Sequence, residues 1–230
     1  MFDAAGELGF FGLQKRLSAD KAFTRSLASI PNQRISTFRG VIKKSADANV
    51  AASYVLGQEN CEDRVAWLLK HLTYIYPADF ASQAAIPWNK PYQHPGVFST
   101  LRACFFNGTS SFAAKHVSEF VSTFTSRPDE KEVPLVMLAL VGTAIHASLS
   151  EWKSGIQKPA AFSGDAFLDA YNEHILLLRG IKEKNPRAYH VMMHKLYQRA
   201  SGVVSDQVGA SHGSAGSALA QVNIDEMDID

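Results

Sequence analysis

The chain has 230 residues, of which 46% are hydrophobic and 20% are charged, and its net charge is +1. This length and composition are typical of one globular domain with tails. Two cysteines, Cys61 and Cys104, exclude a disulfide scaffold, and neither belongs to a CxxC or Cys/His metal pattern.

The first segment, residues 1–24, is expected to be a partly helical extension. Its opening run, "MFDAAGELGFFGLQKR", places acidic residues before an apolar patch of only four residues. A secretory signal has a basic start and a longer apolar stretch, so this run does not match one. Together with two thiols typical of a reducing compartment, this predicts an intracellular protein, cytoplasmic or nuclear.

Residues 25–200 are expected to form one helical domain, because apolar residues there recur at spacings of three and four. The first such stripe runs from Gln33 towards Val55 and contains Ile35, Phe38 and Ile42. This spacing predicts an amphipathic helix with one apolar side.

The other side of this helix is basic and carries Arg34, Arg39, Lys43 and Lys44. Such a face can contact phosphates, although solvated helices often have the same pattern. The charge is also uneven along the chain, because residues 201–230 hold five acids and no Lys or Arg. Weak nucleic-acid binding is therefore an alternative function, with Arg34, Arg39 and Lys43 as candidate contacts.

A second helix is predicted over residues 62–75, "EDRVAWLLKHLTYI", which begins with acids and is stopped by Pro77. The next stretch, residues 76–95, contains four prolines and is expected to be an ordered loop. Its candidate binding residues are Trp88, Lys90, Tyr92 and His94. Stiff aromatic loops serve as recognition surfaces, and they also serve as lids over a core.

Further helical patterns follow in residues 96–106 and 110–124, separated by Asn107-Gly108. Ser110 or Ser111 is expected to cap the second of these helices. The run "SRPDEKE", residues 126–132, is predicted to be a polar turn.

The stretch from Val133 to Trp152, "VPLVMLALVGTAIHASLSEW", is nearly free of charge. It is too short, and too polar at its end, for a membrane span of about 20 apolar residues. A helix that is apolar on nearly every side is expected at the centre of a bundle, here over about residues 134–153. Gly142 and Ala144 would let a neighbouring helix approach this one closely.

Two more helices are expected over residues 164–184 and 186–200, the first capped by Ser163 and the second begun by Asn185-Pro186. The remaining residues, 201–230, are rich in Gly, Ser and Ala and are expected to be a disordered tail with an acidic end. The predicted fold is therefore all-α, a single bundle of about six to eight helices around a buried central helix.

Five segments in this order resemble an uncharacterised helical domain family that is abundant in mushroom-forming basidiomycete fungi. They are "QRISTFRGVIKKSA", "KPYQHPGVFSTLRACFFNG", "VPLVMLALVGTAIHASLSEWKSG", "FSGDAFLDAYNEHILLLRGI" and "AYHVMMHKLY". The resemblance covers about residues 25–200 and implies a soluble helical domain. It implies no activity, cofactor or catalytic residue. The short N-terminus suggests a fragment of a longer protein or a compact member.

Two histidines are the candidates for acid or base chemistry. His146 lies within the apolar run, where a polar ring must find a hydrogen-bond partner. His146 or His174 could act in a cleft, oriented by Glu151 or Glu173. A structural histidine that is satisfied inside the core is the competing interpretation.

His190 and His194 stand four residues apart on a predicted helix, as the half-site of a zinc ion would require. The glutamate of an HExxH motif is absent, and a third ligand would have to be Glu173, His174 or His146. Two histidines on a helix flank, without metal, are the simpler interpretation. We therefore expect no metal and no cofactor.

The phosphate and dinucleotide motifs GxxxxGK[ST] and GxGxxG are absent from the sequence. The sequence thus favours a module that binds a protein partner through the proline-aromatic loop and the basic helix, without a membrane. An enzyme with a histidine and carboxylate pocket is the alternative.

Overall fold

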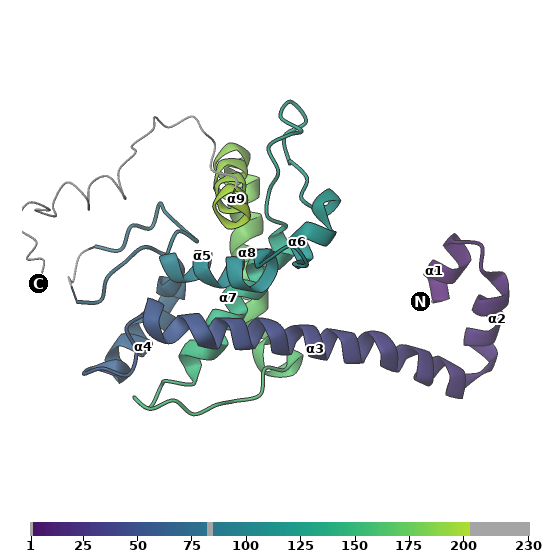
Figure 1. Cartoon of the computed structure of the whole chain (residues 1–230), viewed down its shortest axis with the longest axis horizontal. Helices are drawn as coiled ribbons and strands as arrows, with labels where there is room; N and C mark the ends of the chain where they lie inside the picture. The colour runs from purple at the N-terminus through teal and green to yellow at the C-terminus, as the bar shows by residue number, and fades with distance from the viewer. Residues whose placement is uncertain (1, 82–84, 203–230) are drawn as a thin grey trace, which may run out of the picture.

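The computed structural model describes residues 2–81 and 85–202, and in these residues all regular structure is helical (Figure 1). The α-helices are α1 Phe2–Glu7, α2 Phe11–Ala19, α3 Lys21–Ser53, α4 Cys61–Leu69, α5 Pro95–Leu101, α6 Phe112–Lys115, α7 Leu135–Ser150, α8 Gly164–Lys184 and α9 Pro186–Ser201. Two 3-10 segments, Lys70–Ile75 and Val117–Glu119, and one π-helical segment, Arg102–Phe106, connect them. The predicted all-α class is confirmed, and the predicted disordered tail lies outside the described residues.

Helix α7 lies at the centre of the fold, as its apolar sequence predicts. It packs mainly against α8 and α3, and also against α5 and α4. Eleven of its 16 residues are buried, on every side of the helix. The side chains of Leu138, Val141, Ile145 and Leu149 are fully buried, and each contributes about 1.5–3 kcal/mol to stability. No described helix combines the length and the hydropathy needed to cross a membrane.

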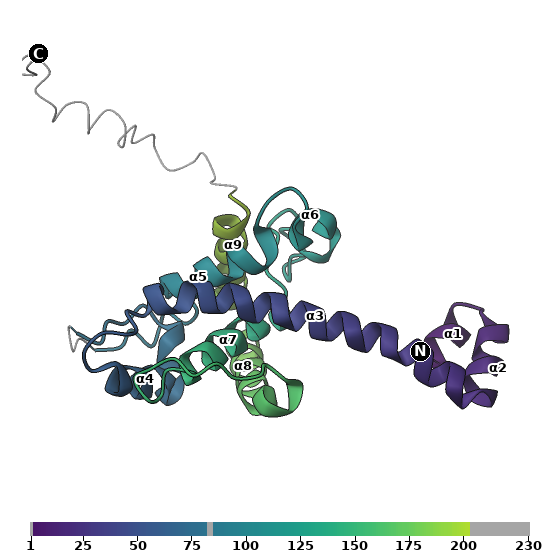
Figure 2. The same cartoon turned by 60° about the horizontal axis from the view of Figure 1, so that its bottom comes forward.

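Helix α3 is the longest element, with 33 residues, and extends about 50 Å. It begins at Lys21 instead of near Gln33 and continues through Pro31, which lacks the amide that a helix uses for its backbone bond. Only its C-terminal half contacts the body, while α1 and α2 lie at its free end (Figure 2). One helix therefore crosses the expected domain boundary at residue 24, and that boundary stays a prediction.

The predicted helix over 62–75 is interrupted, because His71 and Leu72 both adopt positive φ angles near 55°. This turn redirects the chain so that four successive residues, 72–75, are all buried. A surface helix buries only one side, so a continuous helix could not place them there.

The helix predicted over 110–124 is wrong beyond residue 115, apart from one 3-10 turn over Val117–Glu119. Ser111 caps α6, but the α-helix ends at Lys115, because His116 has a non-helical backbone with ψ of 43°. Phe120 is buried, and the backbone N–H of Thr123 donates to the Glu132 carboxylate at 2.5 Å instead of to a helical carbonyl. A side-chain acceptor here replaces the helical hydrogen bond.

The predicted helix starts near the end of the domain are confirmed. The Ser163 hydroxyl accepts from the Ala166 N–H, and the Asn185 side chain accepts from the Ala188 N–H. Helix α9 ends at Gly202, which adopts a left-handed conformation with φ of 75°. These caps position α8, which packs against α7, and α9, which packs against α8.

Candidate functional site

A chain of hydrogen bonds among Tyr74, His174 and Tyr92 crosses the core beside α7. The Tyr74 hydroxyl lies 2.6 Å from His174 Nε2, and the Tyr92 hydroxyl lies 2.8 Å from Nδ1. The Tyr74 hydroxyl also donates to the Gly142 carbonyl, at 3.2 Å. All polar atoms are satisfied when Nε2–H donates to Tyr74 and the Tyr92 hydroxyl donates to Nδ1.

This network fixes the protonation state of His174. Burial and, to a smaller extent, the nearby His146 lower the pKa of His174 to about 3, against a smaller opposing effect of the Gly142 carbonyl. The imidazole is therefore neutral at physiological pH. Its ring lies against Gly142, where an added Cβ would be 2.5 Å from Cε1. A fully buried ring with both nitrogens occupied holds α7, α8 and the 70–92 segment together and has no free lone pair for substrate.

His146 lies next to this network but outside it. Its ring contacts Tyr74 and Phe167 edge to face, at centroid distances of 6.0 and 6.4 Å. Burial, followed by the charge of Lys153, lowers the pKa of His146 to about 4. Its Nδ1 is buried and has no hydrogen-bond partner among the described residues. The sequence predicts a hydrogen-bond partner for this ring, but the described residues supply none for Nδ1.

The carboxylates that were candidates to orient these histidines lie elsewhere. Glu173 is exposed on α8. Glu151 is buried and accepts from Lys43 Nζ at 2.7 Å and from the Ala160 N–H at 2.9 Å. The structure therefore brings His146 and His174 together and gives Glu151 a different partner.

Lys43 belongs to a buried polar cluster rather than to a basic surface. Its ammonium also pairs with Asp47, which accepts from the Ser148 hydroxyl at 2.6 Å. Burial raises the pKa of Glu151, but the hydrogen bonds from Lys43, Ala160 and Gln157 lower it more, and it remains below its ordinary value. The expectation that Lys43 contacts a ligand on an exposed face is wrong, because its side chain is 9% exposed and joins α3 to the end of α7.

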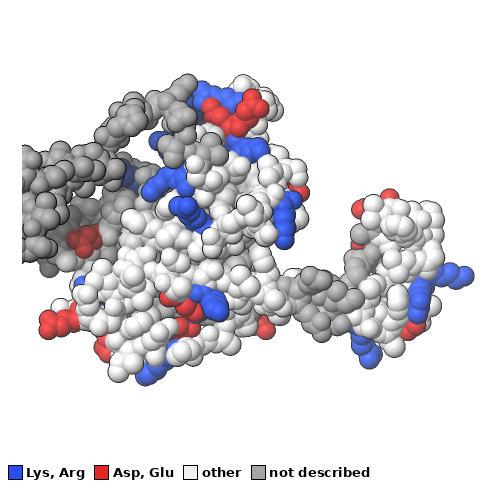
Figure 3. Space-filling model, in the orientation of Figure 1, with Lys and Arg blue, Asp and Glu red and all other residues white. Residues whose placement is uncertain are grey.

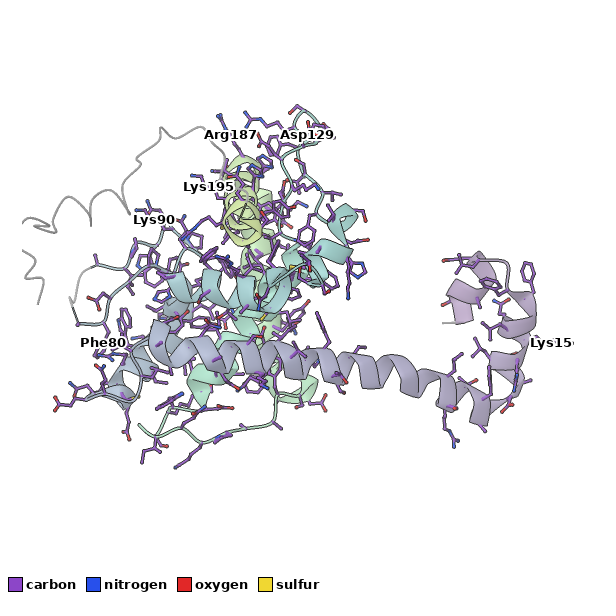
Figure 4. The ribbon with its side chains drawn as sticks, in the orientation of Figure 1. Lys15, Phe80, Lys90, Asp129, Arg187 and Lys195 are labelled. Carbon is purple, nitrogen blue, oxygen red and sulfur yellow. The ribbon has the colours of Figure 1, made fainter. Side chains whose placement is uncertain are left out.

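The two histidines of α9 face one side of the helix, with their rings parallel and 6.0 Å apart. His190 lies between two carboxylates, with Nδ1 2.7 Å from Glu132 and Nε2 2.5 Å from Glu130. His194 Nδ1 lies 2.8 Å from the Lys131 carbonyl. These contacts fasten the 121–133 segment to α9, at the end of the molecule where Asp129 and Arg187 project (Figure 4). Among the described residues, no group of three or more His, Cys, Asp or Glu is arranged to hold a metal ion.

This fastening is expected to weaken as pH rises. Burial lowers the pKa of His190, but its hydrogen bonds to Glu132 and Glu130 raise the pKa more, so the net shift is upward. A raised folded-state pKa stabilises the fold fully below the unfolded value of about 6.5 and loses that contribution as pH rises through the folded value. The urea concentration at the unfolding midpoint should therefore decrease as the pH rises above neutral. A His190→Gln variant should lack this dependence, and the His71→Gln variant, changed at an exposed histidine, should keep it. An NMR titration of His190 below pH 6.5 would contradict the assignment.

The proline-aromatic loop is divided between the surface and the core. Trp88 is 54% exposed and Lys90 is exposed, but Tyr92 and His94 are buried. The His94 ring stacks on Tyr54 at 4.2 Å and accepts from the Gly96 N–H at the start of α5. Burial lowers the pKa of His94 to about 4. The expected exposed patch around Trp88 and Tyr92 is therefore wrong for Tyr92 and His94, which cover the core.

A groove of about 350 Å³ lies between α3, α7 and the first turns of α8. Leu140 and Thr143 of α7 line it together with residues of α3 and α8. The Phe162 and Phe167 rings, 5.5 Å apart, bracket the Ser163 cap of α8 as a hydrophobic staple does. The same pair that fixes the entry of the chain into α8 therefore lines the groove. The full lining is Ile35, Phe38, Arg39, Leu140, Thr143, Phe162, Ser163, Gly164, Phe167, Leu168 and Tyr171.

Arg39 is the cationic residue of this groove. Its guanidinium nitrogens lie close to the backbone of Gly164, where an added Cβ would be 3.3 Å from Nη2. Within residues 2–81 and 85–202, no carboxylate forms an ion pair with Arg39. Of the predicted basic residues, Arg39 is thus the one that lies at a recess, and the side chain of Arg34 lies outside the described part of the chain.

The groove was not predicted as a site, although its staple can be read from the sequence. The letters "FSGDAF", residues 162–167, place aromatic residues at the two staple positions around a serine cap. Other recesses exist, of about 510 Å³ beside Trp67 and Phe80 and about 530 Å³ beside Phe120 and Val121. These recesses carry cations too, but Arg64 in the first is held by the Val55 carbonyl and the Phe80 ring, and Lys131 in the second lies at a more open surface. The groove on α3 sets Arg39 beside three exposed apolar residues, Ile35, Phe38 and Leu168.

The sequence model of a protein family described as a domain of unknown function, DUF6532, matches residues 3–181. No curated protein and no solved structure matches the chain.

Proposed function

The chain belongs to the DUF6532 family, whose domain is of unknown function, and we propose that it is a protein-interaction module. Its groove between α3, α7 and α8 would bind a segment of a partner protein that carries bulky apolar side chains next to a carboxylate. The observation that carries this proposal is the unpaired Arg39 among exposed and half-buried apolar residues.

The apolar part of the groove supports the binding of a hydrophobic segment. Ile35, Phe38 and Leu168 are all exposed at its edges, with Leu168 at 54%. Apolar residues that cluster around a recess mark interaction sites more often than isolated exposed ones do. Burying such side chains in a complex would remove them from water, at about 25 cal/mol for each Å² of apolar surface.

The shape of the groove supports a helical ligand. Residues of α3 and α8 form its two sides, and α7 lies beneath them. An amphipathic helix binds such a groove with apolar residues at spacings of three and four. Arg39 at the edge would then pair with a carboxylate of the ligand, which fixes its direction.

The alternatives have less support. Acid or base chemistry would need His146 or His174 to reach a substrate, and both rings pack within the aromatic cluster around Tyr74. Nucleic-acid binding would need the basic face of α3, from which Lys43 is withdrawn. On the face shown in Figure 3, Lys and Arg are scattered among neutral residues.

We propose that the partner is met inside the cell, in the cytoplasm or the nucleus. Both cysteines are free thiols, and burial raises the pKa of Cys104 to about 12, against a smaller opposing effect of Ser45. Free thiols of this kind are usual in reducing compartments.

A displayed library of random peptides tests the groove without a known partner. Peptides selected on the full chain should share aromatic or aliphatic residues at helical spacing beside an acid. Binding of a selected peptide should weaken about 100-fold in Arg39→Glu, because like charges then meet, and also in Phe167→Asp. The matched control is Arg187→Glu, a charge reversal at an exposed arginine of α9 that does not line the groove, which should bind normally. Peptides that bind all three variants equally would overturn the proposal.

A further inference from the structure

The first two helices and the start of α3 form a small helical unit, the arm, comprising residues 2–27. Gly9, with φ of 75°, turns the chain between α1 and α2, and the Phe10 N–H donates to the Ala5 carbonyl at 2.7 Å. The Asp20 side chain caps α3, and Ala5 and Leu17 are buried between the helices. The arm is thus a folded unit with its own contacts.

The arm stands away from the body of the domain. Both ribbon views show it at the free end of α3, with open space between it and the helices around α7 (Figures 1 and 2). The turn between α1 and α2 is apolar and exposed, with exposed fractions of 70% for Leu8, 58% for Phe10 and 70% for Phe11. Three large apolar side chains on so small a unit indicate a surface that is covered in the working assembly.

We propose that the arm of one copy occupies the groove of a second copy, so that the protein is a two-fold dimer. This inference rests on the proposed function, since it names the ligand of the same groove. The turn between α1 and α2 would supply the bulky apolar side chains, with Leu8 and Phe11 three positions apart, as on one side of a helix, and Phe10 between them. The exposed Glu7 at the end of α1 would supply the carboxylate for Arg39.

The length of α3 excludes the groove of the same chain as the docking place. Ile35, the first groove residue, lies fifteen residues after the Asp20 cap, which corresponds to about 22 Å along the helix axis. A continuous helix between them holds the arm at that distance from its own groove. A second copy removes this constraint, because its groove can approach the arm from outside.

An antiparallel pair of α3 helices satisfies both docking contacts at once. With the two-fold axis near residue 29, the start of each α3 lies opposite residues 37–39 of the partner helix. Each arm then faces the other groove, and the two contacts are identical, as in an isologous interface. The exposed Val41 lies on the same helix near this contact.

Charge complementarity between Glu7 and Arg39 supports the antiparallel arrangement of the two α3 helices. Within the described residues no basic side chain forms an ion pair with Glu7, and no carboxylate forms one with Arg39. Opposite charges across the interface would pair Glu7 of each copy with Arg39 of the other. Lys15 projects from the far side of the arm and leaves this contact free (Figure 4).

Sedimentation of the full chain over a range of concentrations tests the dimer. The wild-type chain should dimerise, and Glu7→Arg and Arg39→Glu should each weaken dimerisation about 100-fold by opposing like charges. The double variant Glu7→Arg/Arg39→Glu should restore it. Phe11→Asp should give monomers, whereas Ile156→Asp, a change at an equally exposed residue outside the arm and the groove, should stay dimeric.

Each other result has a defined meaning. A monomeric wild-type chain whose groove still binds selected peptides overturns the dimer but not the proposed function. A dimer that survives Phe11→Asp and Arg39→Glu uses another surface, and this inference is then wrong. A dimer lost instead when Ile224, Met227 and Ile229 are changed to serine would assign the groove to the acidic C-terminal segment and would also overturn it. Circular dichroism of each variant identifies any that fail to fold.

Discussion

Replacing Lys43 by methionine is expected to lower the free energy of unfolding by about 3–5 kcal/mol. The substitution keeps the volume of the side-chain stem but removes the ammonium that lies 2.7 Å from the Glu151 carboxylate. Glu151, whose side chain is 2% exposed, would then stay buried with its charge uncompensated. Removing one partner of a buried ion pair is far more costly than removing a surface pair. Urea unfolding followed by circular dichroism measures the loss.

The neighbouring residue offers a matched control. Lys44 is exposed, and Lys44→Met should change stability by no more than about 0.5 kcal/mol. A double variant, Lys43→Met/Glu151→Gln, should recover part of the loss, because the amide oxygen can still accept from the Ala160 N–H without a buried charge. Equal stability of the Lys43→Met and Lys44→Met variants would show that the cluster contributes little.

Gly142→Ala is expected to destabilise the protein by roughly 3 kcal/mol, the upper end of the usual cost of overpacking a core. The added Cβ would lie 2.5 Å from Cε1 and 2.6 Å from Nε2 of His174. The ring cannot easily retreat, because Tyr74 and Tyr92 hold its two nitrogens. Either the ring or the α7 to α8 packing must shift, and thermal or urea unfolding would report the loss.

A second glycine in a helix gives the opposite expectation. Gly180 of α8 has no heavy atom within 4 Å of an added Cβ, so Gly180→Ala should stabilise the helix by up to about 1 kcal/mol. The cost of Gly142→Ala should also shrink in a His174→Ser background, where the ring is absent. An undiminished cost there would mean that the clash with His174 is not its cause.

The central helix and the helix starts could be predicted from the sequence because their causes are local. The apolar run of α7 has too few polar residues for a surface helix, and Ser163 and Asn185 satisfy backbone N–H groups only three residues away. Such short-range chemistry is fully present in the letters of the chain.

The surroundings of individual polar residues could not be predicted, because they depend on residues far away in the sequence. Lys43 reads as part of a basic face, yet Glu151, 108 positions later, draws it into the interior. His190 reads as half of a zinc site, but two glutamates about sixty positions earlier occupy both of its nitrogens. No pattern within one helix contains this information.

The candidate groove falls between these two cases. Its staple of Phe162 and Phe167 is local and visible in the sequence, whereas Arg39 joins it only when α3 packs beside α8. A partly helical extension was expected over residues 1–24, but its place at the end of one long helix was not, since Pro31 argues against that helix. The helices could therefore be predicted, but the site could not, because it forms only through packing between residues far apart in the sequence.

The hydrogen-bonded histidine of α8 has a consequence for the newly made chain. Its partners come from residues 74, 92 and 142, so these hydrogen bonds form only after residue 174 has been synthesised and has left the ribosome. Until then α8 does not cover α7, and the apolar side chains of α7 that pack against α8 are exposed to water. Chains that stop before α8 should therefore lack the His174 network and expose apolar side chains of α7.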